Sequence, residues 1–385
     1  MKEITLTATC IFGVESILAR EIRDLGYPEV ETKDGRVSFS CNYSDIPKAN
    51  IRLRVAERVL LKVAEFPAET FDELYDRIKG IDWDMYLSKE ASFPVDVTSI
   101  NSRLFGISAC QSIVKKAIVD KLRSKYKMEV FPESGPCYKV SVALLNNLAA
   151  VYIDTSGVGL HKRGYRTLTG AAPLKETLAA AMIMISRWKK DRVLLDPLCG
   201  TGTIPIEAAL IGKNIAPGLG RSFVSEGWLQ IAEKDWVHAR EEARDLIDRS
   251  VKLNIQGTDI DDKALDMARY HSRMAGTEGD IHFQRRDVRE ISSSKQYGFI
   301  ICNPPYGERI GDKREVEKLY EDMGKVFEKF PTWSKYILTP YKEFERLYGK
   351  KADKRRKLYN GMISCTYYQY FGTKPPKRQN FETEN

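Results

Sequence analysis

The sequence predicts an α/β protein in which two small α+β modules precede a doubly wound domain with a parallel sheet. From about residue 165 onward, short apolar runs alternate with glycine or acidic turns and with helical segments. Such alternation is typical of a sheet covered by helices, which binds its ligands at the carboxyl ends of the strands. Before residue 165, alternating strand-like segments are mixed with amphipathic helical ones, as expected of mixed modules.

The expected elements follow from these patterns. The C-terminal strands are predicted at residues 193–196, 254–259, 281–285, 299–303 and 336–339. The N-terminal strands are predicted at residues 3–9, 36–40, 93–100, 138–144 and 148–154, the last two joined by a turn at Asn146 and Asn147. Helices are predicted at residues 13–25, 72–79 and 107–125. We therefore expect three domains, at residues 1–60, 61–164 and 165–385.

The composition excludes several classes of protein. No apolar run reaches the roughly 18–20 residues of a membrane helix, and the first residues read as a strand and not as a signal peptide. Seven cysteines are scattered singly beside four histidines, which predicts neither disulfides nor a metal site. We expect a cytoplasmic protein without a membrane partner. The formal net charge of +8 permits nucleic-acid binding without establishing it.

A glycine turn follows the first C-terminal strand, which ends at Asp196. The turn lacks the Gly-Lys-Ser/Thr of a phosphate loop, and Pro205 stands where a dinucleotide fingerprint needs its third glycine. Carboxylates at such turns suit a ligand with hydroxyls and a cation, and S-adenosylmethionine carries a sulfonium, an amino group and a ribose but no phosphate. The residues of this turn expected to bind S-adenosylmethionine are Asp196, Pro197, Cys199, Gly200, Thr201, Gly202 and Thr203.

Acidic residues also end the next two strands. Asp259 is placed to accept hydrogen bonds from both ribose hydroxyls; Asp261 is the alternative, unless it only caps the helix that follows. Asp287, or the backbone beside it, is placed to hold the adenine amino group, and the competing interpretation is a solvated acid at a strand end. The cofactor-binding candidates in this part are Asp259, Ile260, Asp261, Asp287, Val288 and Asn303.

The fourth strand runs into Asn303-Pro304-Pro305-Tyr306, the most specific signal in the chain. An amino group on a nucleobase is a poor nucleophile, because its lone pair is delocalised into the ring. The side-chain carbonyl of Asn303 and the backbone carbonyl of Pro304 can hold its two hydrogens, and consecutive prolines make the loop rigid. Tyr306 can stack on the extruded base. No strong general base is required, since positioning supplies most of the catalysis.

Four segments resemble, in order along the chain, the motifs of class I amino-methyltransferases. They are DPLCGTGT, GTDID, the strand before Asp287 and NPPYGERI. The resemblance implies a Rossmann-like domain with a seven-stranded mixed sheet that contains one antiparallel strand. Residues 357–370 resemble the closing strands of enzymes that methylate N2 of guanine in RNA. Residues 1–165 resemble a ferredoxin-like segment followed by a THUMP domain, with the second likeness carried by residues 99–122. The whole chain is similar to the bacterial family that methylates guanine N2 in 23S ribosomal RNA.

Basic residues suggest an RNA-binding surface in the second domain. One group lies around the helix at 107–125, and another lies in the glycine-rich segment 157–166. A solvated helix face is an equally good interpretation of the first group. The basic run 350–357 is either an RNA contact beside the active site or a charged loop. The RNA-binding candidates are Arg103, Lys115, Lys116, His161, Lys162, Arg163, Tyr165 and Arg166.

Three functions are therefore open from the sequence. The first is transfer of a methyl group from S-adenosylmethionine to guanine N2 in RNA, with large-subunit ribosomal RNA or its assembly intermediate as partner. The second is methylation of adenine N6 in RNA or DNA, because the Asn303 motif serves both amino groups. The third is a non-catalytic RNA-binding assembly factor, against which the intact Asp196, Asp259 and Asn303 argue. Trp228 and Trp236 are expected to be packing residues.

Overall fold

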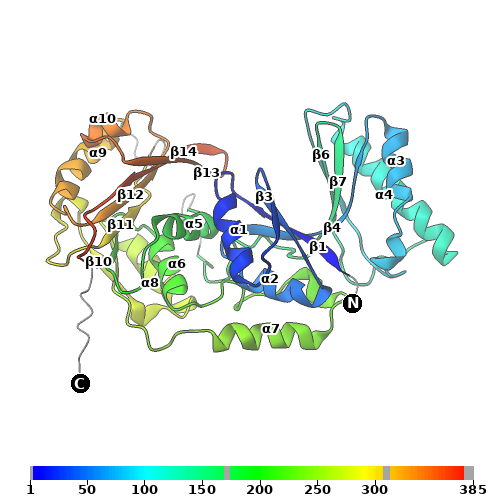
Figure 1. Cartoon of the computed structure of the whole chain (residues 1–385), viewed down its shortest axis with the longest axis horizontal. Helices are drawn as coiled ribbons and strands as arrows, with labels where there is room; N and C mark the ends of the chain where they lie inside the picture. Colours follow the sequence, from blue (N-terminus) through cyan, green and yellow to red (C-terminus); the bar gives the residue numbers. More distant parts are fainter. Residues whose placement is uncertain (1–2, 169–173, 307–312, 377–385) are drawn as a thin grey trace, which may run out of the picture. The chain divides into compact units, whose positions relative to one another are not determined.

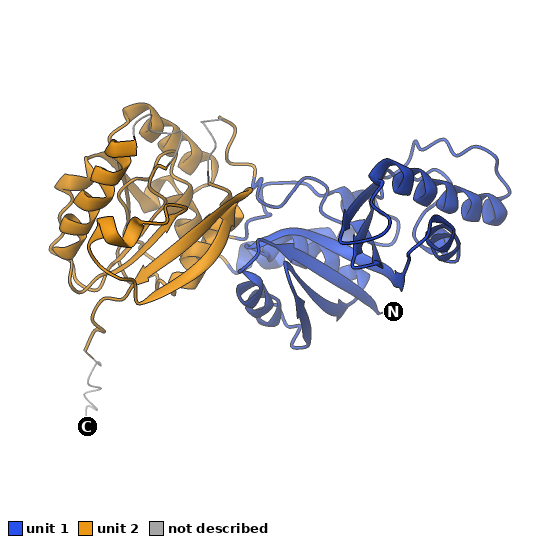
Figure 2. Ribbon diagram, turned by 90° about the horizontal axis from the view of Figure 1, so that it is seen from above, with its two compact units in different colours: residues 1–163, 216–246 blue, residues 164–215, 247–385 orange. Residues whose placement is uncertain are grey.

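The computed structural model describes residues 3–168, 174–306 and 313–376, which form two compact units. One unit comprises Met1–Arg163 and Ala216–Leu246, and the other comprises Gly164–Ile215 and Ile247–Asn385 (Figure 2). The inserted segment 216–246 thus belongs by its packing to the N-terminal unit, although the chain on both sides of it belongs to the C-terminal unit.

The N-terminal unit is built on one seven-stranded sheet (Figure 1). Its strands are β1 (Ile4–Cys10), β2 (Val30–Lys33), β3 (Arg36–Cys41), β4 (Ala56–Pro67), β5 (Val95–Ile100), β6 (Val140–Leu145) and β7 (Leu148–Asp154). They lie in the order β2-β3-β1-β4-β7-β6-β5, and β5 and β6 are the parallel pair. The long β4 pairs with both β1 and β7, so it joins the ferredoxin-like and THUMP-like strands into one sheet.

Apolar side chains on one face of this sheet form the core of the unit. A row of directly paired residues crosses five strands, and each is at most 3% exposed: Phe39, Leu6, Leu61, Ile153 and Val140. Alternation with period two sends these side chains to the same face. The helices that supply the other half of the core are α1 (Glu15–Asp24), α2 (Ile46–Arg52), α3 (Phe71–Lys79) and α4 (Ile107–Tyr126).

The inserted segment carries helix α7 (Glu233–Asp245), which packs against α2. The ring of Trp228 stacks on Tyr138 at a centroid distance of 4.6 Å, and Trp236 stacks on Phe223 at 5.3 Å. Both tryptophans are almost fully buried. Their expected role in packing is confirmed.

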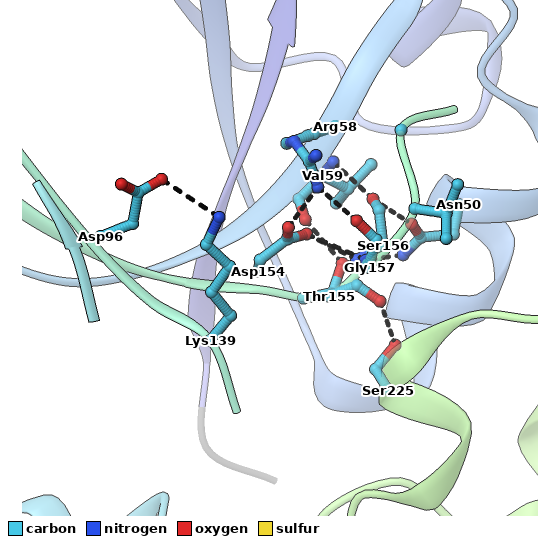
Figure 3. Close-up of polar contacts among 12 residues, drawn as sticks. Asn50, Arg58, Val59, Asp96, Lys139, Asp154, Thr155, Ser156, Gly157 and Ser225 are labelled. Atoms are coloured by element: carbon cyan, nitrogen blue, oxygen red, sulfur yellow. Dashed lines mark hydrogen bonds and ion pairs between the residues drawn. The ribbon is translucent and has the colours of Figure 1, made fainter. Parts of the chain in front are cut away.

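A buried polar turn after β7 also holds the inserted segment (Figure 3). The Ser225 hydroxyl donates to the carbonyl of Thr155 at 2.7 Å, and the Asn50 amide donates to the Thr155 hydroxyl at 2.8 Å. Arg58 pairs with the buried carboxylate of Asp154 at the same turn. Residues from β4, β7, α2 and the inserted segment thus share one network, which is costly to disrupt because Asn50, Asp154, Thr155 and Ser225 are buried.

The C-terminal unit contains a second seven-stranded sheet. Its strands are β8 (Leu194–Asp196), β9 (Ile255–Asp259), β10 (Ile281–Arg285), β11 (Phe299–Cys302), β12 (Ser334–Thr339), β13 (Lys354–Asn360) and β14 (Ile363–Tyr370). They lie in the order β10-β9-β8-β11-β12-β14-β13, in which β14 runs antiparallel to both neighbours. The predicted α/β class and the mixed sheet with one antiparallel strand are confirmed. The helices are α5 (Glu176–Ser186), α6 (Thr203–Gly212), α8 (Asp262–Met274), α9 (Lys313–Glu328) and α10 (Phe344–Tyr348).

The expected elements are present with shifted ends. All five predicted C-terminal strands occur within two residues of their expected bounds. Asn146 and Asn147 both adopt positive φ, as a two-residue hairpin turn requires. The domain limits at 60 and 164 stay a prediction, and β4 runs across the first of them. Among the described residues, no helix is both long and apolar enough to cross a bilayer.

Candidate active site

The carboxyl ends of four parallel strands, β8, β9, β10 and β11, form one edge of the C-terminal sheet. Asp259 stands at its centre, because Oδ2 accepts from the amide of Gly200 at 2.8 Å and Oδ1 accepts from that of Asp261 at 3.0 Å. Its carbonyl accepts from the amide of Arg286, which follows β10. The structure therefore brings together the three strand ends that the sequence singled out.

The glycine turn between β8 and α6 depends on its two glycines. Gly200 and Gly202 both have positive φ, at 49° and 83°. A Cβ on Gly202 would lie 2.9 Å from the Cβ of Ala268 and 3.1 Å from the ring of Phe283, whereas one on Gly200 would meet nothing within 4 Å. The amide of Cys199 donates to the carbonyl of Thr258 at 2.9 Å and fixes the turn to β9.

Asp196 is a buried carboxyl group at the end of β8. Its side chain accepts from the amide of Leu198 at 3.2 Å. Burial raises the pKa of Asp196 well above its usual range, and the nearby Asp259 raises it further. A buried carboxylate is stabilised by a cation, so Asp196 fits the cationic amino-acid end of S-adenosylmethionine.

Replacing Asp196 with asparagine is expected to stabilise the cofactor-free protein while weakening cofactor binding. Since the folded pKa of Asp196 lies above its unfolded value, the folded state loses stability as the pH rises through that interval. We therefore expect the melting temperature of Asp196→Asn to exceed that of the parent at about pH 8, with the gap narrowing toward about pH 5. Thermal denaturation measures the gap, and calorimetry measures the lost affinity.

The control for this pair of measurements is Asp191→Asn, a change to an exposed carboxylate just before the same strand. Asp191→Asn should change neither the melting temperature nor the affinity for S-adenosylmethionine by much. A melting temperature of Asp196→Asn below that of the parent at high pH would show that Asp196 stabilises the fold as a charged group, and the burial argument would be wrong.

Asp261 caps helix α8, because its Oδ1 accepts from the amide of Lys263 at 2.9 Å. Its structural interpretation is therefore confirmed, while Asp259 is anchored in the cofactor turn. Asp259 remains our candidate for the ribose, and Ile260 between the two is 58% exposed. An exposed isoleucine at this edge suits contact with an apolar face of the cofactor, which stays a prediction.

Two substitutions distinguish the acids. We expect Asp259→Asn to weaken S-adenosylmethionine binding by about 10- to 100-fold, since a hydrogen bond to a charged acceptor contributes about 1.5–3 kcal/mol. Asp261→Asn keeps a good capping side chain and should change affinity by less than about threefold. Isothermal titration gives both values. The opposite ranking would assign the ribose to Asp261.

The carboxylate of Asp287 is engaged within its own turn. It accepts from the backbone amide of Arg289 at 2.8 Å and forms an ion pair with its guanidinium at 2.5 Å. This contact lowers the pKa of Asp287. Val288 is buried directly beside it. The backbone carbonyl of Asp287 is also engaged, since it accepts from the amide of Glu290 at 3.0 Å. Neither predicted route for holding the adenine amino group is favoured by these contacts, and both stay predictions.

The loop after β11 presents an acceptor that lacks a donor. Oδ1 of Asn303 is buried and has no hydrogen-bond partner within the described part of the chain. A buried polar atom without a partner is costly, so Oδ1 of Asn303 is our candidate to accept a hydrogen bond from a ligand. Two side chains brace the loop: the Tyr320 hydroxyl lies 3.3 Å from the carbonyl of Pro305, and Asn360 donates to the Tyr306 hydroxyl at 2.8 Å.

Tyr306 is 7% exposed, so most of its ring is covered in this structure. Its predicted stacking on a base stays a prediction, as does the role of the Pro304 carbonyl. The sequence reasoning missed the two braces. Tyr320 lies on the amphipathic helix α9 and Asn360 at the end of β13, and neither position carries a local signal of its function.

Two cysteines lie buried at this edge of the sheet. Burial raises the pKa of the Cys199 and Cys302 thiols well above their usual range, so both remain protonated small apolar side chains. All seven cysteines are free. The described residues contain no group of three or more histidine, cysteine, aspartate or glutamate side chains that could hold a metal ion.

Two of the RNA-binding candidates in segment 157–166 are buried in the structure. Arg163 is 5% exposed and donates to the carbonyls of Leu160 and Arg54 within the N-terminal unit. Tyr165, in the other unit, is also 5% exposed, with its hydroxyl 3.2 Å from Glu207. Both side chains are engaged in hydrogen bonds within the protein, and their contact with RNA stays a prediction.

The remaining basic candidates differ in their availability. Arg166 donates to the carbonyl of Leu174 and to the Thr203 hydroxyl, so it supports the start of the cofactor helix α6. His161 lies 3.4 Å from Glu57, whereas Lys162 is exposed. For Arg166, His161 and Lys162, the predicted RNA contact rests on their charge and stays a prediction.

Around α4, two of the RNA-binding candidates form ion pairs with glutamates at the protein surface. Arg103 forms an exposed ion pair with Glu69 at 2.5 Å. Lys115 pairs with Glu133 at 2.6 Å and lies over the ring of Phe93 at 3.5 Å. Exposed ion pairs are weak and exchange readily. An RNA role for Arg103, Lys115 and Lys116 therefore stays a prediction.

The sheet order, the glycine turn and the Asn303 loop define an S-adenosylmethionine-dependent class I methyltransferase. The chain belongs to the RMKL-like methyltransferase family, whose domain model matches residues 163–369. The model of the RlmL ferredoxin-like domain matches residues 5–60, and that of the THUMP domain matches residues 68–154.

Named relatives agree with this assignment. A Bacillus subtilis protein, provisionally named an RNA methyltransferase, is 45% identical over the full length of both chains. The ribosomal RNA large subunit methyltransferase K/L of Syntrophotalea carbinolica is 34% identical over 94% of this chain and 53% of its own. The present chain thus spans about half the length of the K/L relatives.

Solved structures agree as well. One methyltransferase complexed with S-adenosylhomocysteine is 41% identical, with a TM-score of 0.92 over 98% of this chain and 100% of that one. A predicted N6-adenine-specific DNA methylase from Listeria monocytogenes is 46% identical, with a TM-score of 0.92 over 97% of both chains. The fold and the cofactor class are shared, and among these four relatives the Listeria protein alone has a name that specifies an acceptor base.

Proposed function

We propose that this protein methylates N2 of a guanine in RNA, and that the RNA is large-subunit ribosomal RNA. The observation that carries the reaction type is the buried, unpartnered carbonyl oxygen of Asn303 at the end of β11. The THUMP domain and relatives named as RNA methyltransferases support RNA as the substrate. The K/L relatives and the resemblance of residues 357–370 support guanine N2 in the large subunit.

The loop at Asn303 activates the amino group by holding its hydrogens. With Asn303 Oδ1 and the Pro304 carbonyl as acceptors, the nitrogen becomes pyramidal and its lone pair points out of the base plane. S-adenosylmethionine, when bound, supplies a methyl group that is already activated by the sulfonium. The chain's own contribution is therefore orientation, which Tyr320 and Asn360 secure by bracing Pro305 and Tyr306.

The cofactor would be held by the residues around the glycine turn. Asp196 would face its cationic end, and Asp259 would accept from the ribose hydroxyls. The backbone of residues 199–202 allows close approach because two glycines adopt positive φ there. None of these groups has to donate or accept a proton during methyl transfer.

Methylation of adenine N6 is the second candidate, since the same two acceptors fit that amino group and a close structural relative bears that name. Nucleoside mass spectrometry of ribosomal RNA from a strain that lacks the gene distinguishes the two. Loss of N2-methylguanosine from large-subunit RNA, restored by the wild-type gene, is the expected result. Unchanged N2-methylguanosine with loss of N6-methyladenosine would replace our proposal with the second candidate.

A further inference from the structure

The turn between β13 and β14 exposes a large apolar side chain. Asn360 pairs with Ile363, and Gly361 takes a φ of 63° in the two-residue turn between them. Met362, the second turn residue, is 99% exposed, the highest value among the large hydrophobic residues described as exposed. Packing within the described part of the chain gives no reason for an apolar residue at this position.

The hairpin projects beyond the edge of the sheet at which the active site lies. The last residue of β12, Thr339, pairs with Thr366, so residues 363–365 of β14 pair with β13 alone. Three residues correspond to roughly 10 Å of extended chain. Since β13 and β12 are both antiparallel to β14, the end of β13 lies at the carboxyl edge of the parallel strands.

A hydrogen bond ties this hairpin to the catalytic loop. Nδ2 of Asn360, the residue that enters the turn, donates to the Tyr306 hydroxyl at 2.8 Å. Leu358 and Cys365, which face each other across the hairpin, are buried and anchor its base. The position of Met362 is therefore fixed relative to the loop that begins at Asn303.

The strand that carries the turn also presents cations. Lys357 of β13, which pairs with Thr366, is exposed and lies 5.2 Å from the ring of Tyr359. Arg355 is held by Glu345. An exposed lysine on the strand that leads to an apolar tip suits an RNA partner, because it can contact a phosphate near an opened base stack.

Methyl transfer to a base amino group requires that the base leave its stack. A pyramidal nitrogen directs its lone pair out of the base plane, where stacked neighbours lie, so enzymes of this kind extrude the target base. The gap that remains must be filled. Proteins that hold nucleic acids open insert apolar side chains, methionine among them, between bases, and an unbranched thioether adapts well to such a gap.

We propose that Met362 is a wedge that enters the RNA and occupies the space left by the extruded target guanine. This inference rests on the proposed function, because it requires a base substrate in a folded RNA. The Asn360–Tyr306 contact sets the distance between the wedge and the acceptor groups. Met362 thus acts on access to the reaction and not on the transfer step.

The test compares single-turnover methylation by the wild type and by Met362→Ala on two RNAs. One is the unmodified, folded large-subunit ribosomal RNA, and the other is a short single strand of the same sequence around the methylated guanine. We expect Met362→Ala to lose about 10- to 100-fold in rate on the folded RNA, because unstacking goes uncompensated, and less than about threefold on the single strand. Met362→Leu should retain most of the activity.

A second readout follows the base directly. With 2-aminopurine at the target position and S-adenosylhomocysteine present, the wild type should raise the fluorescence severalfold and Met362→Ala should not. Met274→Ala, which alters another exposed methionine on helix α8 near the opposite side of the sheet, is the matched control and should behave as wild type.

The outcomes separate the two proposals. Equal losses on both RNAs, or no loss on either, would overturn the wedge while leaving guanine methylation intact. Unchanged rates with weakened binding to a protein of the ribosomal particle would instead assign Met362 to a protein contact. Absence of N2-methylguanosine from both RNAs with the wild type would overturn the proposed function, and the wedge with it.

Discussion

Asn303→Ala should turn over at least about 100-fold more slowly than the parent, while its affinity for S-adenosylmethionine, to which Asn303 is also a candidate contributor, should fall far less. The lost carbonyl is buried and without a partner in the described chain, so its removal leaves the fold little changed. A hydrogen bond that strengthens as charge develops in the transition state contributes about 3–4 kcal/mol, or roughly 100- to 1,000-fold in kcat. Calorimetry gives the affinity, and single-turnover assays give the rate.

Two controls sharpen this prediction. Asn254→Ala removes an exposed amide that precedes β9, at the opposite edge of the same sheet, and should leave both quantities unchanged. Asn303→Asp keeps an acceptor but adds a charge, and some rate should return relative to alanine. Wild-type turnover in Asn303→Ala would show that the amino group is activated by other groups.

Gly202→Ala is expected to weaken cofactor binding by more than about tenfold and to lower the melting temperature. Two effects combine at this position. A left-handed backbone costs a residue with a Cβ about 1–2 kcal/mol, and the new Cβ would lie 2.9 Å from Ala268 and 3.1 Å from Phe283. The turn must shift to relieve these contacts, and the backbone that approaches the cofactor shifts with it.

Gly276→Ala is the matched control. Gly276 has a φ of 69°, but an added Cβ would meet nothing within 4 Å. It should therefore lose stability from the backbone conformation alone and bind S-adenosylmethionine with unchanged affinity. If Gly202→Ala also bound the cofactor normally, the close approach at the glycine turn would have no functional consequence.

Much of the catalytic unit could be predicted because its signals are local. At Asp196 and at Asp259, the features that predict the site lie within a few residues of each other. They are a short apolar strand, a glycine or an acid at its end, and a helix after it. The order of these units along the chain then fixes a parallel sheet. An asparagine followed by two prolines at the end of a buried strand, as at Asn303, is a specific signal for the acceptor loop of an amino-methyltransferase.

Sequence patterns were least informative where the environment of a side chain depends on distant partners. Segment 157–166 has the composition of an exposed basic turn, but Arg163 is buried against carbonyls that include that of Arg54. Local charge does not report on such contacts, since a guanidinium with carbonyl partners can be buried. The braces Tyr320 and Asn360 escaped prediction for the same reason, because each meets the catalytic loop only after the sheet has assembled.

The inserted segment 216–246 shows the same limit of local reasoning. Its two tryptophans indicated packing, but their partners Tyr138 and Phe223 could not be chosen from the sequence. Neither could the network at Thr155, in which Ser225 and Asn50 come from segments far apart in the chain. Such pairings depend on the completed fold of the N-terminal unit.

The path of the chain has a consequence for how such proteins can be divided or recombined. Because residues 216–246 fold with the N-terminal unit, the chain crosses between the units after residues 163, 215 and 246. A fragment that starts at Gly164 would display Trp228 without the ring of Tyr138 and leave the N-terminal unit without a piece of its core. The two units therefore cannot be exchanged between proteins by a single cut at residue 163. An exchange that keeps both cores intact must transfer residues 216–246 along with residues 1–163.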